Sequence, residues 1–312
     1  MPMSPLHETW FVHDPAAYPL DWTAMTRPTV VAGVTAAGLL ALAWRGVGRR
    51  LPVPELPPLA RLGRLAAWAP RLLALHLGVS LVLLAWRRAV LDPGIGVPTG
   101  WLGTALLLPE VFAGVLLVAG RQTQWSAGAV ASAGPVVLAM SGPTALLSCL
   151  VLLGIAVFLL LLPPRPGLAG RAVLDHERLR LATLALRVGA AGTLITLAVV
   201  EKLANPAMAH AMLVQKPVLD LLSPFGISSD RFALIAGCTE VLFGLLVLSG
   251  ALPQVVALVA AIPFSATLLV FGGTELIGHL PVYGILLCLL LLGSRRDTSL
   301  EVSRVRRTLV AV

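Results

Sequence analysis

The stretch Glu110–Gly120, EVFAGVLLVAG, returns at Glu240–Gly250 as EVLFGLLVLSG. Five of the eleven positions are identical, and most of the others exchange one apolar or small residue for another. Each copy places a carboxylate in the middle of an apolar run long enough to span a bilayer. A charged side chain at that depth costs about 3 kcal/mol on insertion scales. A costly group repeated within one motif indicates a duplicated membrane unit, and it directs the search for function to Glu110 and Glu240.

The composition is typical of a polytopic membrane protein. Hydrophobic residues make up 57% of the chain and charged residues 12%, whereas soluble domains have about 45–50% and about 25%. Apolar runs of about 17–22 residues predict an all-α polytopic protein with nine transmembrane helices. Their expected limits are 28–45, 71–87, 101–120, 126–142, 144–163, 183–202, 231–250, 252–272 and 278–293. The bilayer is therefore the first expected partner.

The basic residues give the expected orientation. Sixteen of the 23 arginines and lysines fall in alternate loops and in the C-terminal tail. By the positive-inside rule these segments are cytoplasmic, so the N-terminus lies outside and the C-terminus inside. This pattern is typical of a multi-pass protein of a bacterial or archaeal plasma membrane. The net charge of +8 then reflects membrane topology, and no nucleic-acid partner is expected.

The repeat divides the chain into two parallel four-helix units, residues 71–163 and 183–293. An even number of crossings gives both units the same orientation, so we expect them to be related by an axis along the membrane normal. One extra helix, 28–45, precedes them. The remaining segments are an external N-terminal segment 1–27, a cytoplasmic basic loop 46–70, a cytoplasmic linker 164–182 and a cytoplasmic basic tail 294–312.

The second unit carries short motifs in a particular order. These are Leu186-Arg187, Glu201-Lys202-Leu203-Ala204-Asn205-Pro206, the central Glu240, and Gly278-His279-Leu280-Pro281. That order of arginine, lysine, glutamate and histidine resembles the DoxX-like membrane proteins. The first unit keeps Arg71 and Glu110, but Trp86-Arg87-Arg88 replaces Glu-Lys. The resemblance implies a four-helix fold and an association with quinone-linked oxidation of sulfur compounds or thiols.

The two repeat glutamates have a functional and a structural interpretation. As functional groups, Glu110 and Glu240 exchange protons or contact a quinone. As structural groups, they hydrogen-bond to the backbone or to an arginine of a neighbouring helix. Arg187 and its counterpart Arg71 either join this site or extend to the membrane surface. The sequence leaves both interpretations open, and we treat Glu240, Glu110 and Arg187 as candidate catalytic residues.

Further polar residues gather near the expected outer ends of the second unit. His279 is a candidate catalytic residue because it can relay protons, while Glu201, Lys202 and Glu275 are candidates for holding a cofactor. With the N-terminal segment above them they predict a shallow site open to the outside. The alternative is ordinary solvation at the interface.

The long loop at 203–230 is apolar and is expected to form a short interfacial helix. Methionine and histidine are soft ligands suited to Cu(I). The candidate metal ligands are His7, His13, Met208, His210 and Met212. On a helix, however, His210 points away from the two methionines, so apolar anchoring is the alternative role of this segment.

Three classes of function are compatible with this sequence. The first is a membrane subunit of a quinone-linked oxidoreductase system, with a soluble redox partner chain, because this chain has no haem ligand pair, flavin motif or iron–sulfur cysteine set. The second is a proton-coupled transporter of a small solute or metal ion. The third is a non-catalytic membrane scaffold. Quinone is the expected cofactor of the first class, with copper as the alternative, and no substrate is specified.

Overall fold

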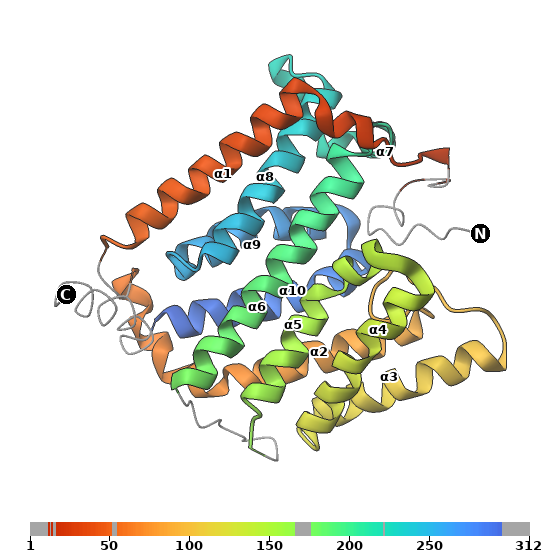
Figure 1. Ribbon diagram of the computed structural model, residues 1–312, viewed down its shortest axis with the longest axis vertical. Helices are drawn as coiled ribbons and strands as arrows, with labels where there is room; N and C mark the ends of the chain where they lie inside the picture. The colour runs from red at the N-terminus through yellow and green to blue at the C-terminus, as the bar shows by residue number, and fades with distance from the viewer. Residues whose placement is uncertain are drawn as a thin grey trace.

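The computed structural model describes residues 12, 14, 17–51, 55–165, 176–220 and 222–294. These residues form helices joined by turns and loops, and the β-type pairing among them is one isolated antiparallel bridge between Ala89 and Gly96. The longer elements are α1 (Pro28–Gly48), the 3₁₀ segment η4 (Pro57–Trp68), α2 (Ala69–Trp86), α3 (Trp101–Ala119), α4 (Thr123–Ser148), α5 (Leu150–Leu161), α6 (His176–Leu197), α7 (Pro206–Gln215), α8 (Ser229–Ser249), α9 (Pro253–Phe271) and α10 (Gly273–Gly293). Figure 1 shows their arrangement, with α1 beside α8 at one edge and α3 and α4 at the opposite edge.

The structure confirms an all-helical protein with the helices of a polytopic membrane protein. In the part of the chain that it describes, eight helices are long and apolar enough to cross a bilayer, and Leu150–Leu161 is a shorter apolar helix. The expected turn between the fourth and fifth spans is present, because Gly142 leaves the helical conformation with φ of 84°. Gln124 donates to the carbonyl of Leu160 across this turn. The helices on its two sides are therefore antiparallel. The predicted number of nine spans agrees approximately with the described helices.

The two predicted units pack in the same way. In the first, α2 packs against α3, α3 against α4, α4 against α5, and α5 against α2. In the second, α6, α8, α9 and α10 repeat this cycle. Between the units the last helix of each contacts the first helix of the other, α5 with α6 and α10 with α2. This reciprocal packing is the arrangement that two parallel repeats related by a twofold axis produce.

Two pairs of equivalent residues support the repeat. A side chain at Gly114 would meet the carbonyl oxygen of Gly78 on α2, and one at Gly244 would meet Ile195 and the carbonyl of Ala191 on α6. Each repeat glycine thus allows its helix close to the first helix of its unit. Arg71 donates to the carbonyls of Leu117 and Val118 at the end of α3.

Arg187 takes the corresponding position in the second unit. One of its terminal nitrogens occupies the space that a side chain at Gly250 would need, at the end of α8. Arginine at the C-terminal end of a helix complements the negative end of the helix dipole and its last carbonyls. The two arginines therefore stabilise the same junction in each unit.

The segment between α1 and α2 is more ordered than the sequence predicts. The loop expected at 46–70 includes the 3₁₀ segment η4, and Glu55 accepts a hydrogen bond of 3.0 Å from the backbone nitrogen of Gln254. Gln254 is fully buried, and its side chain accepts from the backbone nitrogen of Leu56 and donates to Ser294. Trp44 donates to the carbonyl of Ala251. The extra helix is thus bound to the start of α9.

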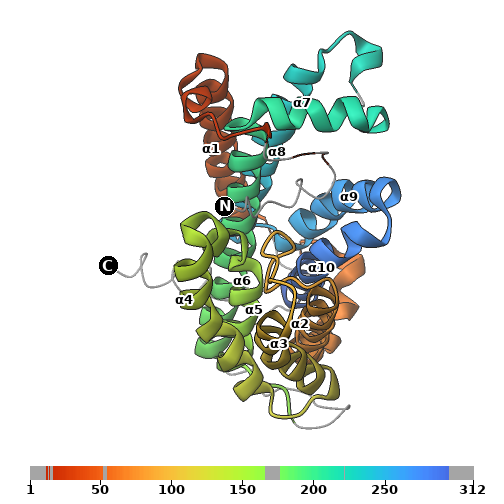
Figure 2. The same ribbon diagram turned by 90° about the vertical axis from the view of Figure 1, so that its right-hand side faces the viewer.

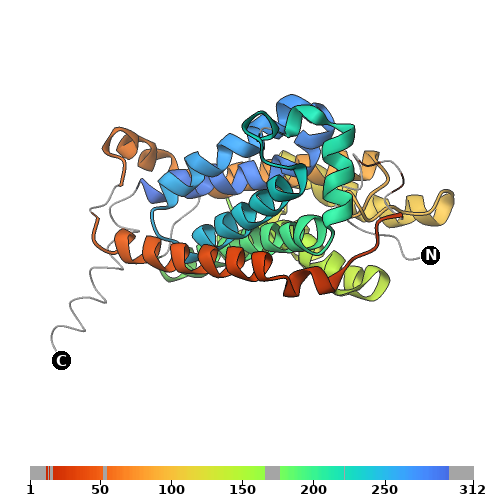
Figure 3. The same cartoon turned by 90° about the horizontal axis from the view of Figure 1, so that it is seen from above.

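The opposite end of the second unit is covered by shorter elements. Here α7 forms the predicted short helix in the loop 203–230, and it runs across the ends of the long helices (Figure 2). Seen from above, α1 and α8 lie next to each other along one side (Figure 3). A 3₁₀ turn, η3 (Trp22–Thr26), leads into α1 at this end.

Candidate functional site

The last turn of the sixth span is a π-helix, η5 (Ala198–Leu203), instead of an α-helix. The amide of Ala204 donates a 2.7 Å hydrogen bond to the carbonyl of Val199. The two residues are five positions apart, which is the separation of a π turn, whereas hydrogen-bonded residues of an α-helix are four positions apart. Asn205 then caps α7 by accepting from the amide of Met208, and Pro206 takes the first helical position. A π turn inserts an extra residue into a helix and is frequent at functional sites. The π turn of this protein contains Glu201 and Lys202.

Lys202 lies between two carboxylates. Its amine is 3.2 Å from Glu240 Oε1 and 4.0 Å from Glu201 Oε2. The side chain of Glu201 is 2% exposed and that of Lys202 is 12% exposed, whereas Glu240 is 35% exposed. Three ionisable groups in an apolar bundle stabilise one another only as a set, because removal of one leaves an unpaired buried charge. Glu240 is the most exposed member of the set.

A second buried pair lies in the first two turns of α10. Glu275 Oε1 is 3.4 Å from His279 Nδ1, and their side chains are 3% and 13% exposed. The ring of His279 packs edge-on against Phe264 of α9, with ring centres 4.7 Å apart. Because α10 begins at Gly273, both residues belong to the span, and the expected start at residue 278 is too late.

The N-terminal segment covers this end of the unit, as the sequence predicts. Val12 packs with Val200, Met208 and Met212, and Tyr18 and Phe271 lie against the same cluster. The amide of Asp21 donates to the carbonyl of Ala204, and Asn205 donates to the carbonyl of Tyr18. The described part of the N-terminal segment thus packs against the π turn and the start of α7.

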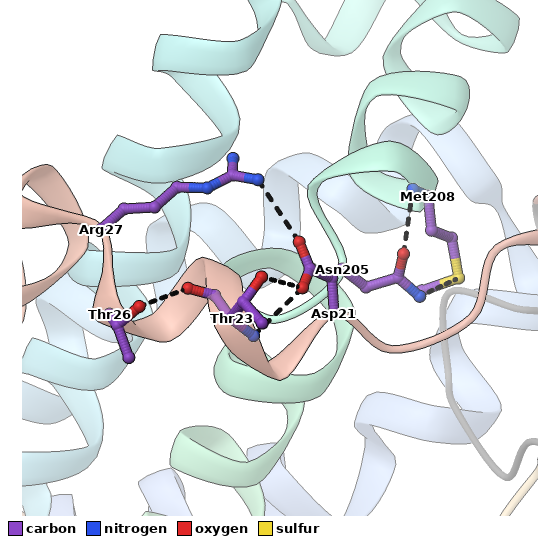
Figure 4. Close-up of polar contacts among 6 residues, drawn as sticks. All are labelled: Asp21, Thr23, Thr26, Arg27, Asn205 and Met208. Atoms are coloured by element: carbon purple, nitrogen blue, oxygen red, sulfur yellow. Dashed lines mark hydrogen bonds and ion pairs between the residues drawn. The ribbon is translucent and has the colours of Figure 1, made fainter.

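Figure 4 shows the polar contacts of the covering segment. Asp21 accepts hydrogen bonds from the backbone and hydroxyl of Thr23 and lies 3.3 Å from Arg27. The hydroxyl bond from Thr23 is the largest cause that lowers the pKa of the Asp21 carboxyl below its usual value. Asn205 and Met208 lie behind this turn. The covering segment is thereby fixed to the start of α1.

A cleft of about 850 Å³ opens at this end, between η3, α1, α7 and the start of α8. Lys202 lines it, together with Arg27, His210, Asp230 and Arg231, while Glu240 does not. The structure therefore brings together Glu201, Lys202 and Glu240 from the predicted set. It places Glu275 with His279 on α10.

Glu110 has different surroundings from Glu240. It is buried, and its Oε1 accepts a 3.1 Å hydrogen bond from the backbone nitrogen of Leu91. The loop that follows α2 folds back so that Ala89, Leu91 and Ile95 are buried in the core of the protein. This geometry corresponds to the structural interpretation of Glu110.

Arg187 does not lie with the other candidate catalytic residues. It precedes Lys202 by fifteen residues on the same helix, which is about 22 Å at 1.5 Å per residue. The expectation that Arg187 shares a site with Glu240 is therefore corrected. The guanidinium of Arg187 lies against Gly250, at the C-terminal end of α8. Its role is the helix-end contact described above.

The predicted soft-metal ligands are not brought together where the structure describes them. Met208 and Met212 are buried in an apolar cluster, and His210 instead forms a 2.9 Å contact with Asp230. His7 and His13 lie outside the described residues. Within the described ranges, no three His, Cys, Asp or Glu side chains are grouped so that they could hold a metal ion. Apolar anchoring, the alternative, fits the two methionines.

The sequence does not predict the direct contact between Lys202 and Glu240, because it places Glu240 in the middle of one span and Lys202 at the outer end of another. The missing information was the π turn, since no periodicity in the sequence distinguishes it from an α-helix. The adjacent Asn205-Pro206 pair did signal that the helix ends there. Comparison with known proteins adds no further constraint, because no family model, curated protein or solved structure matches the chain. The resemblance to DoxX-like proteins therefore rests on the sequence motifs alone.

Proposed function

We propose that this protein is a membrane subunit of a quinone-linked oxidoreductase system, and that its second four-helix unit carries the functional site. The observation that supports this most is the position of Lys202 between Glu201 and Glu240 at the π turn. An amine and two carboxylates at hydrogen-bonding or ion-pairing distance can take up and release protons inside an apolar protein. The resemblance to DoxX-like proteins supplies the link to quinones.

The residues present fit such a role. A quinone, when bound, supplies two-electron and two-proton redox chemistry. Glu240 is one-third exposed and would accept or return a proton at its carboxylate, while Lys202 holds that carboxylate in place. Glu275 and His279 form a second group on α10 that can move protons. Electrons would come from, or go to, a partner chain that carries its own redox cofactor.

Binding of decylubiquinone to the full-length protein in nanodiscs tests this proposal. We expect Glu240→Gln and His279→Ala to weaken binding. Glu110→Gln is the matched control, because it makes the same change in the first unit, and it should leave binding unchanged. Loss of binding in Glu110→Gln, with wild-type binding in the other two variants, would place the site in the first unit and contradict the proposal.

A proton-coupled transporter is the second candidate, and the reciprocal packing of the two units favours it, since such repeats can move against each other. Transporter binding sites are typically formed by helices that are broken within the membrane. Gly272 does not break a helix in this way, because it forms the turn between α9 and α10. In liposomes loaded with pyranine, a transporter would pass protons in a manner that depends on Glu240. A quinone-linked subunit would not do so without its partner.

The orientation belongs to the same proposal. The arginine distribution supports an outward N-terminus in a bacterial or archaeal plasma membrane, which puts the Lys202 site at the outer face. In a background without the three native cysteines, a cysteine at Ser4 should react with an impermeant maleimide in intact cells. A cysteine at Ser303 should not. The reverse labelling would move the site to the cytoplasmic face.

A further inference from the structure

The cleft beside the π turn has an excess of basic side chains. Arg27, Lys202 and Arg231 line it, while Asp230 is its one acidic residue among those described. Asp230 already contacts His210, and Lys202 already has Glu201 and Glu240 beside it. The positive charge open to a ligand is therefore that of Arg27 and Arg231. Its chemistry favours a ligand that carries acidic oxygens.

The ion pair between Arg27 and Asp21 does not close the cleft to such a ligand. The two atoms are 3.3 Å apart, and both side chains are about half exposed. Ion pairs of this kind contribute little in water and rearrange readily. A phosphate, which forms shorter and stronger hydrogen bonds with guanidinium groups, would compete for Arg27. Arg231 is exposed at the first turn of α8 and also lines the cleft.

The surroundings of the cleft place it at the level of lipid headgroups. Exposed apolar side chains occur on every short element around it, at Trp22, Val214, Val218 and Phe225. Tryptophan and other large apolar residues on short elements that lie across the ends of spans are typical of the membrane interface. Between the cations the wall is apolar, formed by residues such as Val30, Leu203 and Leu234. A molecule with an acidic head and an apolar body matches this combination.

We propose that the cleft binds an acidic phospholipid of the surrounding leaflet, with the phosphate held by Arg27 and Arg231 and the first carbons of its acyl chains against Val30 and Leu234. Lys202 lines the cleft and also belongs to the proposed redox site, but the two arginines that hold the phosphate are not members of the Lys202 group, and Glu240 does not line the cleft. The lipid would contact η3, α1, α7 and α8 and hold these elements together. It would thereby fix the elements that cover the π turn.

Lipid retention by the full-length protein tests this proposal. The protein is purified from nanodiscs of equal parts phosphatidylglycerol and phosphatidylcholine, and the retained lipids are counted by native mass spectrometry. The wild type should retain one phosphatidylglycerol in preference. Arg27→Gln with Arg231→Gln should lower that preference by roughly thirtyfold, as expected for two cations near a membrane surface. The matched control is Arg45→Gln with Arg49→Gln, which removes two exposed arginines at the other end of α1.

A steric variant separates the cleft from a general surface attraction. Ala207→Trp adds bulk at an exposed position of the cleft wall without changing charge. It should lower retention as much as the double arginine variant does. Equal losses in both arginine pairs, or full retention in Ala207→Trp, would overturn the proposal. Displacement of the lipid by millimolar glycerol 3-phosphate would overturn it in favour of a soluble anion.

Discussion

Glu110 and Glu240 occupy the same position of the same eleven-residue motif, yet they have different partners. Glu110 in the first unit accepts a hydrogen bond from the backbone of Leu91. Glu240 in the second unit is paired with the amine of Lys202. The difference originates at the end of the preceding helix, where the first unit has Trp86-Arg87-Arg88 and the second has Glu201-Lys202.

The loops that follow differ in the same way. In the first unit the chain turns at Arg88 and Leu91, both with positive φ, and folds back into the core to reach Glu110. In the second unit the chain continues through the π turn into α7. The repeat glutamate is contacted there by the amine of Lys202 instead of by a loop amide. The repeated motif therefore specifies how the helices pack. The residues at the neighbouring helix end decide whether its glutamate is a structural acceptor or part of a charged group.

The largest effect should come from Lys202→Met. This variant leaves Glu201 and Glu240 near each other without their common cation, and breaking a buried pair from one side costs about 3–5 kcal/mol. Since Glu240 is one-third exposed, we expect a loss of about 2–4 kcal/mol in the free energy of unfolding. Unfolding in a series of sodium dodecyl sulfate fractions would measure it. The triple change with Glu201→Gln and Glu240→Gln should recover most of the loss, and failure to recover would mean that the lysine acts through packing alone.

The repeat glycines provide the next comparison. A side chain at Gly114 would lie 2.8 Å from the carbonyl oxygen of Gly78, which is backbone and cannot move aside. At Gly244 the nearest atom is 2.7 Å away but belongs to the side chain of Ile195, and the backbone carbonyl oxygen of Ala191 is farther, at 3.2 Å. We expect Gly114→Ala to cost about 2 kcal/mol and Gly244→Ala less than about 1 kcal/mol, since overpacking is costly where neighbours are rigid. The same unfolding assay applies, and equal losses would show that the first unit is no more tightly packed at this point.

Much of this architecture follows from the sequence because it depends on local patterns. Apolar runs define the spans, Gly142 marks a turn, and the repeat of Glu, Gly and Gly indicates two similar units. The contacts of the site depend instead on distant segments. Glu110 meets a loop that returns from Leu91, Gln254 meets Glu55 across about 200 residues, and the π turn is a change of helix type without a sequence period. Each is decided by tertiary packing, which local patterns do not encode.

Two variants of Glu110 sharpen its structural role. Glu110→Ala removes the acceptor of the Leu91 amide and leaves a small cavity, so we expect a loss of about 1–2 kcal/mol. Glu110→Gln keeps an oxygen acceptor of the same shape and should be nearly neutral. Hydrogen exchange at the Leu91 amide would report the contact directly, becoming faster in the alanine variant only. Equal stability of the two variants would contradict a role for this hydrogen bond.

The smallest effect concerns Glu55, which gives the second unit a backbone-bound carboxylate of its own. It accepts from the amide of Gln254, and burial is the main cause that raises the pKa of Glu55 above its usual value of 4.5. The folded protein therefore binds more protons than the unfolded chain just above pH 4.5, and stability should fall as pH rises through this window. Glu55→Gln keeps the acceptor and removes the titration, so its stability should change less with pH than that of the wild type. Thermal unfolding from pH 4 to pH 7 measures the difference, and Glu177→Gln, which changes an exposed carboxylate in the first turn of α6, is the control. Parallel curves for wild type and Glu55→Gln would show that this carboxylate titrates as it does in water. In that case the burial of Glu55 against α9 would make no contribution to the pH dependence of stability.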